Sequence, residues 1–86
     1  MISLCYVYII QCKDNTLYTG WTIDLDKRIS LHNLGKASKY TRSRLPVQLV
    51  YFEKYDNKID AQKREYAIKQ LSRQQKLKLI KNKSFI

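Results

Sequence analysis

Residues 4–23 read LCYVYIIQCKDNTLYTGWTI, and this stretch decides the fold of the chain. Leu4 to Gln11 is rich in Tyr, Val and Ile, and Leu17 to Ile23 is rich in Tyr, Trp and Thr. Such residues favour strands, and the Lys13-Asp14-Asn15 sequence between the two runs favours a turn. The stretch therefore predicts a β-hairpin.

The length of the hairpin loop decides whether Tyr8 and Tyr18 share a face of the sheet. Side chains alternate along a strand, so a two-residue loop at Asp14-Asn15 would place the two rings on opposite faces, whereas an odd loop places them together. Tyr8 and Tyr18 can form a joint site only in the second case. A joint site therefore predicts a loop of about three or five residues.

A helix that can aim polar groups at the sheet is expected after the hairpin. Thr22 or Asp24 can cap it, and Gly35 can stop it in a left-handed conformation. Arg28 and His32 stand four residues apart, so they project together from one flank of this helix.

The rest of the chain predicts one more strand and further helices. Residues 36–44 read as a loop and residues 47–55 as a strand. A helix is expected from about Asp60, and the S-x-x-Q pattern at residues 72–75 predicts that a last helix begins at Arg73. The element order ββαβαα indicates an α+β fold with a small, mainly antiparallel sheet.

Charge indicates a polyanionic partner. The 86 residues carry 17 Lys and Arg against 7 Asp and Glu, a net charge of +10, which favours nucleic acid through counterion release. A merely solvated basic surface is the alternative. We expect one domain over residues 1–86, placed in the cytoplasm, with no membrane partner, because the apolar residues 2–10 lack a basic leader and are too short to span a bilayer.

The expected loop over residues 36–44 has the composition of a nucleic-acid surface. Cations can contact phosphates, hydroxyls can contact phosphate oxygens and one ring can stack on a base, which suits single-stranded or distorted nucleic acid. A solvated loop of the same composition is the alternative. The candidate contacts are Lys36, Lys39, Tyr40, Thr41, Arg42 and Arg44.

Glu65 is the only acid after Asp60, in a tail that carries eight cations. An ordinary explanation is an ion pair with Lys69, one helical turn later. A functional explanation is a Mg²⁺ ligand, because this ion keeps several waters and takes only one or two carboxylates when a substrate phosphate completes its shell. The residues alone leave both explanations open.

Several of these features, taken in order, resemble one protein family. They are Tyr6-Val7-Tyr8, Tyr18-Thr19-Gly20, Arg28 with His32 on the first helix, and Arg64-Glu65 on a later one. Their order and spacing resemble the GIY-YIG nuclease superfamily, and in particular its small stand-alone bacterial members, from near residue 4 to about residue 80. Either tripeptide alone would be uninformative.

The resemblance implies a three-stranded antiparallel sheet flanked by helices, and divalent-metal-dependent cleavage of DNA. The residues that match catalytic positions are Tyr8, Tyr18, Arg28, His32 and Glu65. Glu65 would hold one Mg²⁺ or Mn²⁺ ion, Arg28 would neutralise charge on phosphorus, and His32 would relay a proton or contact phosphate. One tyrosine would help to deprotonate the attacking water and the other would orient it, and the residues do not decide which.

Trp21 departs from the family pattern, because it follows Gly20 where many members carry a lysine, and it offers a stacking ring instead of a phosphate contact. We expect an endonuclease that acts on branched, structured or single-stranded DNA in repair or recombination, with DNA favoured over RNA and a protein partner able to deliver it. The alternative is a binding module that keeps the fold and does not cut.

Overall fold

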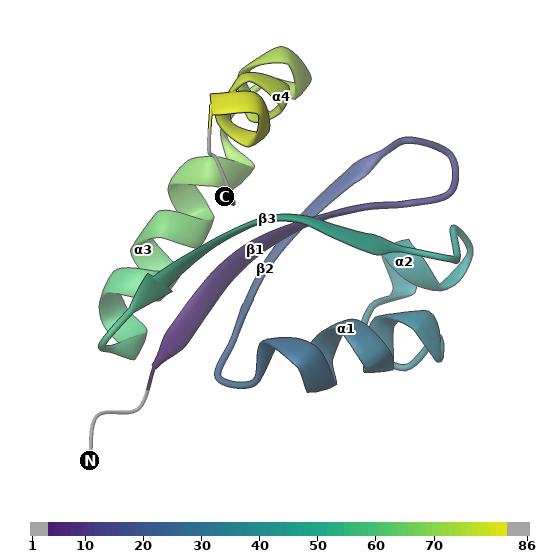
Figure 1. Ribbon diagram of the computed structural model, residues 1–86, viewed down its shortest axis with the longest axis horizontal. Coiled ribbons are helices and arrows are strands. Elements are labelled where there is room, and N and C mark those ends of the chain that lie inside the picture. Colours follow the sequence, from purple (N-terminus) through teal and green to yellow (C-terminus); the bar gives the residue numbers. More distant parts are fainter. Residues whose placement is uncertain (1–3, 83–86) are drawn as a thin grey trace.

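The computed structural model describes residues 4–82, and Figure 1 shows their arrangement. The elements in chain order are β1 (Cys5–Gln11), β2 (Leu17–Thr22), α1 (Leu25–Asn33), α2 (Lys39–Arg42), β3 (Gln48–Tyr55), α3 (Lys58–Lys69) and α4 (Arg73–Asn82). This is the predicted α+β order ββαβαα, with the one-turn helix α2 added between α1 and β3. None of the helices within these residues is long and apolar enough to cross a membrane.

The sheet has the order β2-β1-β3 with both pairs antiparallel. Helices α1 and α2 lie on one side of it, and α3 and α4 lie on the other (Figure 1). Because side chains alternate along the central strand β1, Val7 and Ile9 pack toward α3, whereas Tyr8 and Ile10 pack toward α1. The sheet therefore separates two small cores, one beneath α1 and one beneath α3, so its two faces can serve different roles.

The hairpin loop holds five residues, 12–16, because Gln11 pairs with Leu17. This register places Tyr8 opposite Gly20 and leaves Tyr18 on the same face as Tyr8. The predicted odd loop and the shared face of the two phenols are confirmed.

A side-chain cap explains where α1 begins, and a glycine explains where it ends. Asp24 is the N-cap and accepts a hydrogen bond from the Lys27 amide at 3.1 Å, while the Thr22 hydroxyl accepts one from the Asp24 amide at 3.2 Å. Gly35 has φ +74°, the left-handed conformation expected of it. Of the two predicted caps, Asp24 is the one used.

The expectation of an uninterrupted loop over residues 36–44 is wrong, because Lys39–Arg42 form one turn of helix. The Ser38 side chain accepts a hydrogen bond from the Tyr40 amide at 3.1 Å and so caps this turn. A serine that caps a helix and a serine that contacts solvent look alike in composition, which is why the sequence suggested only a loop.

Helix α3 begins at Lys58, slightly before the predicted Asp60, because the Asn57 side chain accepts a hydrogen bond from the Asp60 amide at 2.8 Å. Helix α4 begins at Arg73 as predicted. Ser72 and Gln75 form its capping box through hydrogen bonds of 2.8 and 3.2 Å between side chains and amides.

Candidate active site

Tyr8 lies in the middle of the sheet on the face toward α1, where it is 2% exposed. A Cβ atom at Gly20, its partner on β2, would lie 2.5 Å from the Tyr8 hydroxyl oxygen. No side chain tolerates that distance, so the ring extends over β2 only because residue 20 is glycine. The phenol oxygen is thereby carried to an edge strand of the sheet.

His32, near the end of α1, bonds to the Tyr8 hydroxyl. Tyr8 Oη and His32 Nε2 are 2.8 Å apart, and His32 Nδ1 lies 2.9 Å from the Thr41 hydroxyl on α2. The side chains of all three residues are buried. Asn33 anchors this end of α1, because its amide exchanges hydrogen bonds of 2.7 and 3.1 Å with the backbone of Val47.

The hydrogen bonds of Thr41 indicate which nitrogen of His32 carries the proton. The Thr41 hydroxyl donates to the Ser38 carbonyl at 3.4 Å, so its oxygen is left to accept from His32 Nδ1–H. His32 Nε2 is then the unprotonated acceptor of the Tyr8 hydroxyl. Tyr8 thus donates to His32, His32 donates to Thr41, and Thr41 donates to a main-chain carbonyl. With the hydrogen bonds in this order, the buried imidazole is neutral.

Burial and nearby charges keep the Tyr8–His32 pair neutral. Burial raises the pKa of Tyr8 well above that of an ordinary phenol, Tyr18 and Glu65 add to the rise, and Arg28 opposes it. Burial also lowers the pKa of His32, and the charge of Arg28 lowers it further. The charge of Arg28 favours the phenolate of Tyr8, but desolvation outweighs this effect.

Tyr18 approaches the same group from β2. Its ring packs edge-on against His32 with centroids 5.4 Å apart, and it stacks on Tyr40 of α2 at 5.9 Å. Tyr18 is half-buried, whereas Tyr8 is buried. Arg28 projects half-buried from α1, within electrostatic reach of both Tyr8 and His32. Four of the five sequence-predicted catalytic residues are therefore gathered on this face.

Glu65 comes from α3, across the sheet. Its side chain is 19% exposed and its carboxylate lies 3.7 Å from Lys69 Nζ, so the ion pair offered as the ordinary explanation is present. Its charge nevertheless raises the pKa of Tyr8, which places it within electrostatic reach of the phenol. The pair is long and Lys69 is half-exposed, so the lysine can give way to another cation at little cost.

The donor set at Glu65 suits an ion that needs few protein ligands. Within residues 4–82 no three or more His, Cys, Asp or Glu side chains converge on one point. A single carboxylate fits Mg²⁺, which retains waters and completes its shell with substrate phosphate. Glu65 could therefore hold such an ion together with the substrate.

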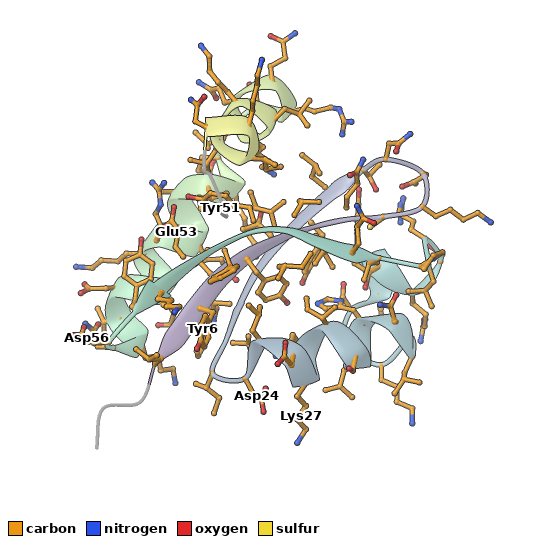
Figure 2. All side chains as sticks on the ribbon, in the orientation of Figure 1. Tyr6, Asp24, Lys27, Tyr51, Glu53 and Asp56 are labelled. Atoms are coloured by element: carbon orange, nitrogen blue, oxygen red, sulfur yellow. The ribbon has the colours of Figure 1, made fainter. Side chains whose placement is uncertain are left out.

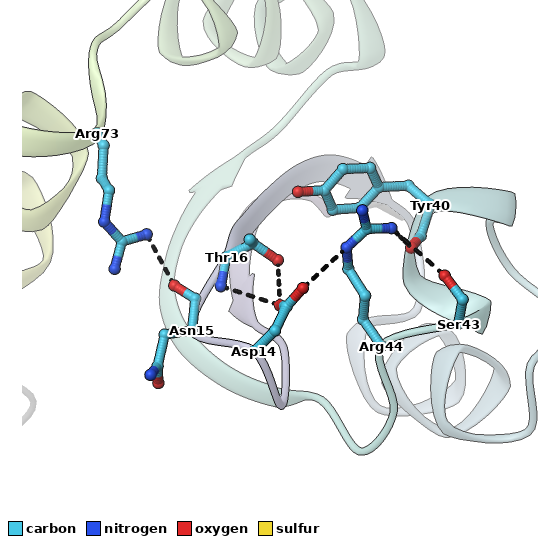
Figure 3. Close-up of polar contacts among 7 residues, drawn as sticks. All are labelled: Asp14, Asn15, Thr16, Tyr40, Ser43, Arg44 and Arg73. Carbon is cyan, nitrogen blue, oxygen red and sulfur yellow. Dashed lines mark hydrogen bonds and ion pairs between the residues drawn. The ribbon is translucent and has the colours of Figure 1, made fainter.

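Some of the residues predicted to contact nucleic acid are exposed, and others are buried or already paired. The expectation that Thr41 contacts nucleic acid is wrong, because its side chain is fully buried against His32. The Tyr40 ring already carries the Arg44 guanidinium at 4.0 Å, and Arg44 is ion-paired with Asp14 at 3.1 Å (Figure 3). The cations that remain on the exposed surface of this segment are Lys36, Lys39 and Arg42.

Trp21 lies on the other face of the sheet from Tyr18, because the two residues differ by an odd number of positions along β2. It packs against the core beneath α3, with Lys58 Nζ 5.6 Å from its ring centroid. The ring is half-buried there, so a stacking role beside Tyr8 and Tyr18 is not supported by its position.

A cluster on β3 and α3 was missed by sequence reasoning. Glu53 accepts hydrogen bonds from the hydroxyls of Tyr51 and Tyr55 and two from Arg64, at 2.9 and 3.0 Å. Figure 2 shows Tyr51 and Glu53 on the part of β3 beside α3. The available signal was the alternation Tyr51, Glu53, Tyr55, which puts one acid between two phenols on a strand face. Because Arg64 precedes Glu65, this cluster also fixes the rotation of α3 that presents Glu65.

The α+β fold carries two tyrosines on paired strands, an arginine and a histidine on the following helix, and a glutamate on a later helix. This arrangement is that of a GIY-YIG domain. The chain belongs to this family: the model of the GIY-YIG catalytic domain matches residues 4–78. The family is of the nuclease type, and its members are generally dependent on a divalent metal ion.

Relatives that this chain covers almost completely are small proteins of one group within the family. The chain is 63% identical over 79 residues to a UPF0213 protein of Clostridium perfringens, covering 92% of this chain and 85% of that one. It is 56% identical over 78 residues to one of Staphylococcus haemolyticus, covering 91% and 95%. The solution NMR structure of a UPF0213 protein from Bacillus halodurans matches with a TM-score of 0.62 and 45% identity, covering 95% of this chain and 87% of that chain.

Proposed function

We propose that this protein is an endonuclease that cleaves phosphodiester bonds of DNA with the help of one Mg²⁺ or Mn²⁺ ion. The observation that carries the proposal is the 2.8 Å hydrogen bond between the Tyr8 hydroxyl and His32 Nε2, because it couples a phenol to a neutral proton acceptor. Membership of a nuclease-type family supports the same class of reaction.

In this proposal Tyr8 is the general base and His32 receives its proton. Water attacks phosphorus and gives a proton to the Tyr8 oxygen while the Tyr8 proton passes to His32 Nε2, so that no free phenolate has to form in a buried position. The bond from phosphorus to the leaving oxygen breaks, and that oxygen takes a proton from solvent. Tyr18, the more exposed phenol, orients the water.

Arg28 links proton transfer to the presence of substrate. Burial lowers the pKa of His32, and the charge of Arg28 lowers it further, so an imidazolium is disfavoured in the free protein. A phosphate bound at Arg28 offsets that charge and makes His32 a better proton acceptor. The same guanidinium faces the charge that grows on the phosphoryl oxygens, a contribution of roughly 3 kcal/mol in a site shielded from water.

Glu65 would hold the Mg²⁺ or Mn²⁺ ion once Lys69 has moved aside. Bound there, the ion supplies a Lewis acid for the phosphate and the leaving oxygen. Burial is the main cause of the raised pKa of Tyr8, but Glu65 adds to it and Arg28 opposes it, so both groups lie within electrostatic reach of the phenol. A phosphate bound beside that phenol would interact with the Arg28 guanidinium and with the ion held by Glu65.

The substrate we propose is branched, structured or single-stranded DNA, with a role in repair or recombination in the cytoplasm. The net charge of +10 on 86 residues supports a nucleic-acid partner. A domain of this size offers little surface for reading a long base sequence, which favours recognition of strand geometry or delivery by a partner protein.

One observation favours a second function, a nucleic-acid-binding module that does not cut. The Glu65 carboxylate, which is the proposed metal ligand, is already paired with Lys69. A chain that kept the fold and basic surface after losing catalysis would retain this contact.

Cleavage assays separate the two functions. Labelled single-stranded, duplex, flap and four-way-junction DNA, with matched RNA strands, would be incubated with Mg²⁺, Mn²⁺ or EDTA. We expect metal-dependent products from the wild type and a loss of at least about 100-fold in Glu65→Gln. Lys78→Gln, which removes an exposed charge elsewhere on the surface, serves as the control.

Three outcomes would count against the endonuclease. Products that persist unchanged in Glu65→Gln would identify a contaminant. Products that form equally in EDTA would remove the metal ion from the proposal. Binding of every substrate without cleavage of any would leave the binding module as the function.

A further inference from the structure

A small cationic notch lies beside the active site, between the hairpin loop and the carboxyl-terminal helix. It is a cavity of about 210 Å³ lined by Thr16, Leu17, Tyr40, Arg73 and Lys76. Three segments that are far apart in sequence form its walls: the start of β2, helix α2 and the first turn of α4. Two of the five lining residues are cations and none is an acid.

The Arg73 guanidinium is held in place from one side. Its Nη1 donates to the Asn15 carbonyl at 2.7 Å, across the gap between α4 and the hairpin loop (Figure 3). The other donors of the fork have no protein acceptor among the hydrogen bonds of the described residues. The nearest acid of the loop, Asp14, is engaged by the Thr16 hydroxyl at 2.6 Å and by Arg44.

Lys76 lies close to other cations, and a bound anion would reduce the repulsion between them. It is half-buried, and burial together with the charge of Lys69 lowers its pKa. Lys69 in turn contacts Glu65 at 3.7 Å. A row of cations, Lys69, Lys76 and Arg73, therefore leads from the proposed metal-binding carboxylate to the hairpin loop.

The notch is connected to the reaction residues as well. Leu17, which lines it, precedes Tyr18, and Tyr40, which also lines it, stacks on Tyr18 at 5.9 Å. Leu17 and Tyr18 belong to β2, which is an edge strand of the sheet. Gly20, over which the Tyr8 hydroxyl lies, is farther along the same strand. A nucleic-acid strand that follows this edge passes from one place to the other.

We propose that the notch binds a backbone phosphate of the substrate strand beside the phosphate that is cleaved, with Arg73 and Lys76 as its cationic contacts. The inference rests on the proposed function in so far as the ligand is a nucleic acid. It makes the substrate a strand that continues past the scissile phosphate on the α4 side. Arg73 and Lys76 are residues that composition alone could not separate from the other cations of the tail.

The test measures binding of a fluorescent single-stranded oligonucleotide in EDTA over a range of salt concentrations. Each phosphate contact adds about 0.7 to the slope of log affinity against log salt on single strands. We expect the double variant Arg73→Gln/Lys76→Gln to lower the slope by about 0.7 and the affinity by roughly tenfold at low salt. The double variant Lys63→Gln/Lys78→Gln removes the same charge from exposed positions and should change the slope less.

Two further measurements guard against a damaged loop and a non-specific anion site. Arg73→Lys keeps the charge but loses the guanidinium fork, so it should keep the slope, and its thermal unfolding reports the contact with Asn15. The backbone amides of Thr16 and Leu17 should shift in ¹⁵N NMR with the oligonucleotide at concentrations where inorganic phosphate leaves them unchanged.

The proposal fails if both double variants lower the slope equally, if Arg73→Lys loses as much as Arg73→Gln/Lys76→Gln, or if inorganic phosphate shifts the amides as strongly as the oligonucleotide. These outcomes are independent of catalysis. A wild type that binds strands but cuts none removes the endonuclease and leaves the slope comparison valid, whereas a wild type that binds no strand removes both.

Discussion

The two faces of the sheet carry two tyrosine clusters that differ in charge. On the α1 face the Tyr8 hydroxyl bonds to a neutral imidazole, and every group in the chain to Ser38 is uncharged. On the α3 face Tyr51 and Tyr55 donate to Glu53, whose charge is balanced by the Arg64 guanidinium. Both clusters join a phenol to a neighbour inside the protein.

This difference in charge indicates that the Glu53 cluster has a structural role and that the Tyr8–His32 pair can take part in proton transfer. Burial and hydrogen bonds to Glu53 raise the pKa of Tyr51 and of Tyr55 to about 12. Burial alone would raise the pKa of Glu53, but the hydrogen bonds from Arg64 and the two tyrosines keep it below its usual value. That carboxylate is therefore a poor proton acceptor, whereas a neutral His32 can take a proton. Similar tyrosines thus differ in use because their acceptors differ.

Removing one hydroxyl from each face gives the largest expected contrast. Tyr8→Phe should lower the rate of cleavage by about 10² to 10⁴, because the general base is lost. Tyr55→Phe removes a phenol of the same kind from the Glu53 cluster and should leave the rate within about twofold. Single-turnover assays on the best substrate measure both. Equal losses of cleavage rate in the two variants would show that Tyr8 has no special role in the reaction.

Gly20→Ala tests whether the Tyr8 ring needs its path over β2. The new Cβ would lie 2.5 Å from the hydroxyl oxygen, so the ring must move, and we expect about 1–3 kcal/mol less stability and a large loss of cleavage. Gly35→Ala is the matched control, because its φ of +74° makes alanine cost about 1 kcal/mol outside the catalytic residues. Urea unfolding and cleavage by the folded fraction would be compared. An active Gly20→Ala protein would contradict the tight packing.

A change in the Glu53 cluster should lower the stability of the protein. Arg64→Met leaves Glu53 without its cation and should cost about 1–3 kcal/mol, a range reduced because the Arg64 side chain is 37% exposed. The double variant Arg64→Met/Glu53→Gln should recover part of the loss, since no unpaired charge remains. Urea denaturation of the four proteins of this cycle measures the coupling. Strictly additive losses would mean that the pair contributes little.

The smallest effect expected concerns pH. Because the folded-state pKa of His32 is lowered, the unfolded chain binds more protons below an unfolded value of about 6.5, and stability falls as the pH drops below it. The slope can reach at most about 1.4 kcal/mol per pH unit for one group. His32 is the one histidine of the chain, so His32→Gln should flatten unfolding data between about pH 5 and 6.5. A slope that survives this variant would point to another group.

Local sequence patterns were sufficient for the fold but not for every contact. The tyrosine pair, Gly35 and the Ser72–Gln75 capping box could be predicted because each depends on residues near one another in the chain or on strand alternation. The odd hairpin loop was predicted only from the requirement that Tyr8 and Tyr18 share a site. The helical turn at residues 39–42 and the burial of Thr41 could not, since they depend on α2 packing against His32 of α1.

The same reasoning explains what was seen and missed in the candidate site. Arg28 and His32 are one turn apart, so a helix brings them together. The Arg64–Glu53 pair joins residues 11 positions apart on different elements, and the Arg73–Asn15 contact spans 58. Such contacts follow from how α3 and α4 pack on the sheet, which no local pattern specifies.

The two faces of this sheet also come with built-in reporters. The chain has one histidine and one tryptophan: His32 belongs to α1 and faces the sheet, and Trp21 packs beneath α3. The imidazole gives a single set of ring ¹⁵N resonances that reads the proton position in the active site, while indole fluorescence reads the opposite core. A spectroscopist can therefore follow each side of the sheet separately in the unmodified protein, without introducing a label.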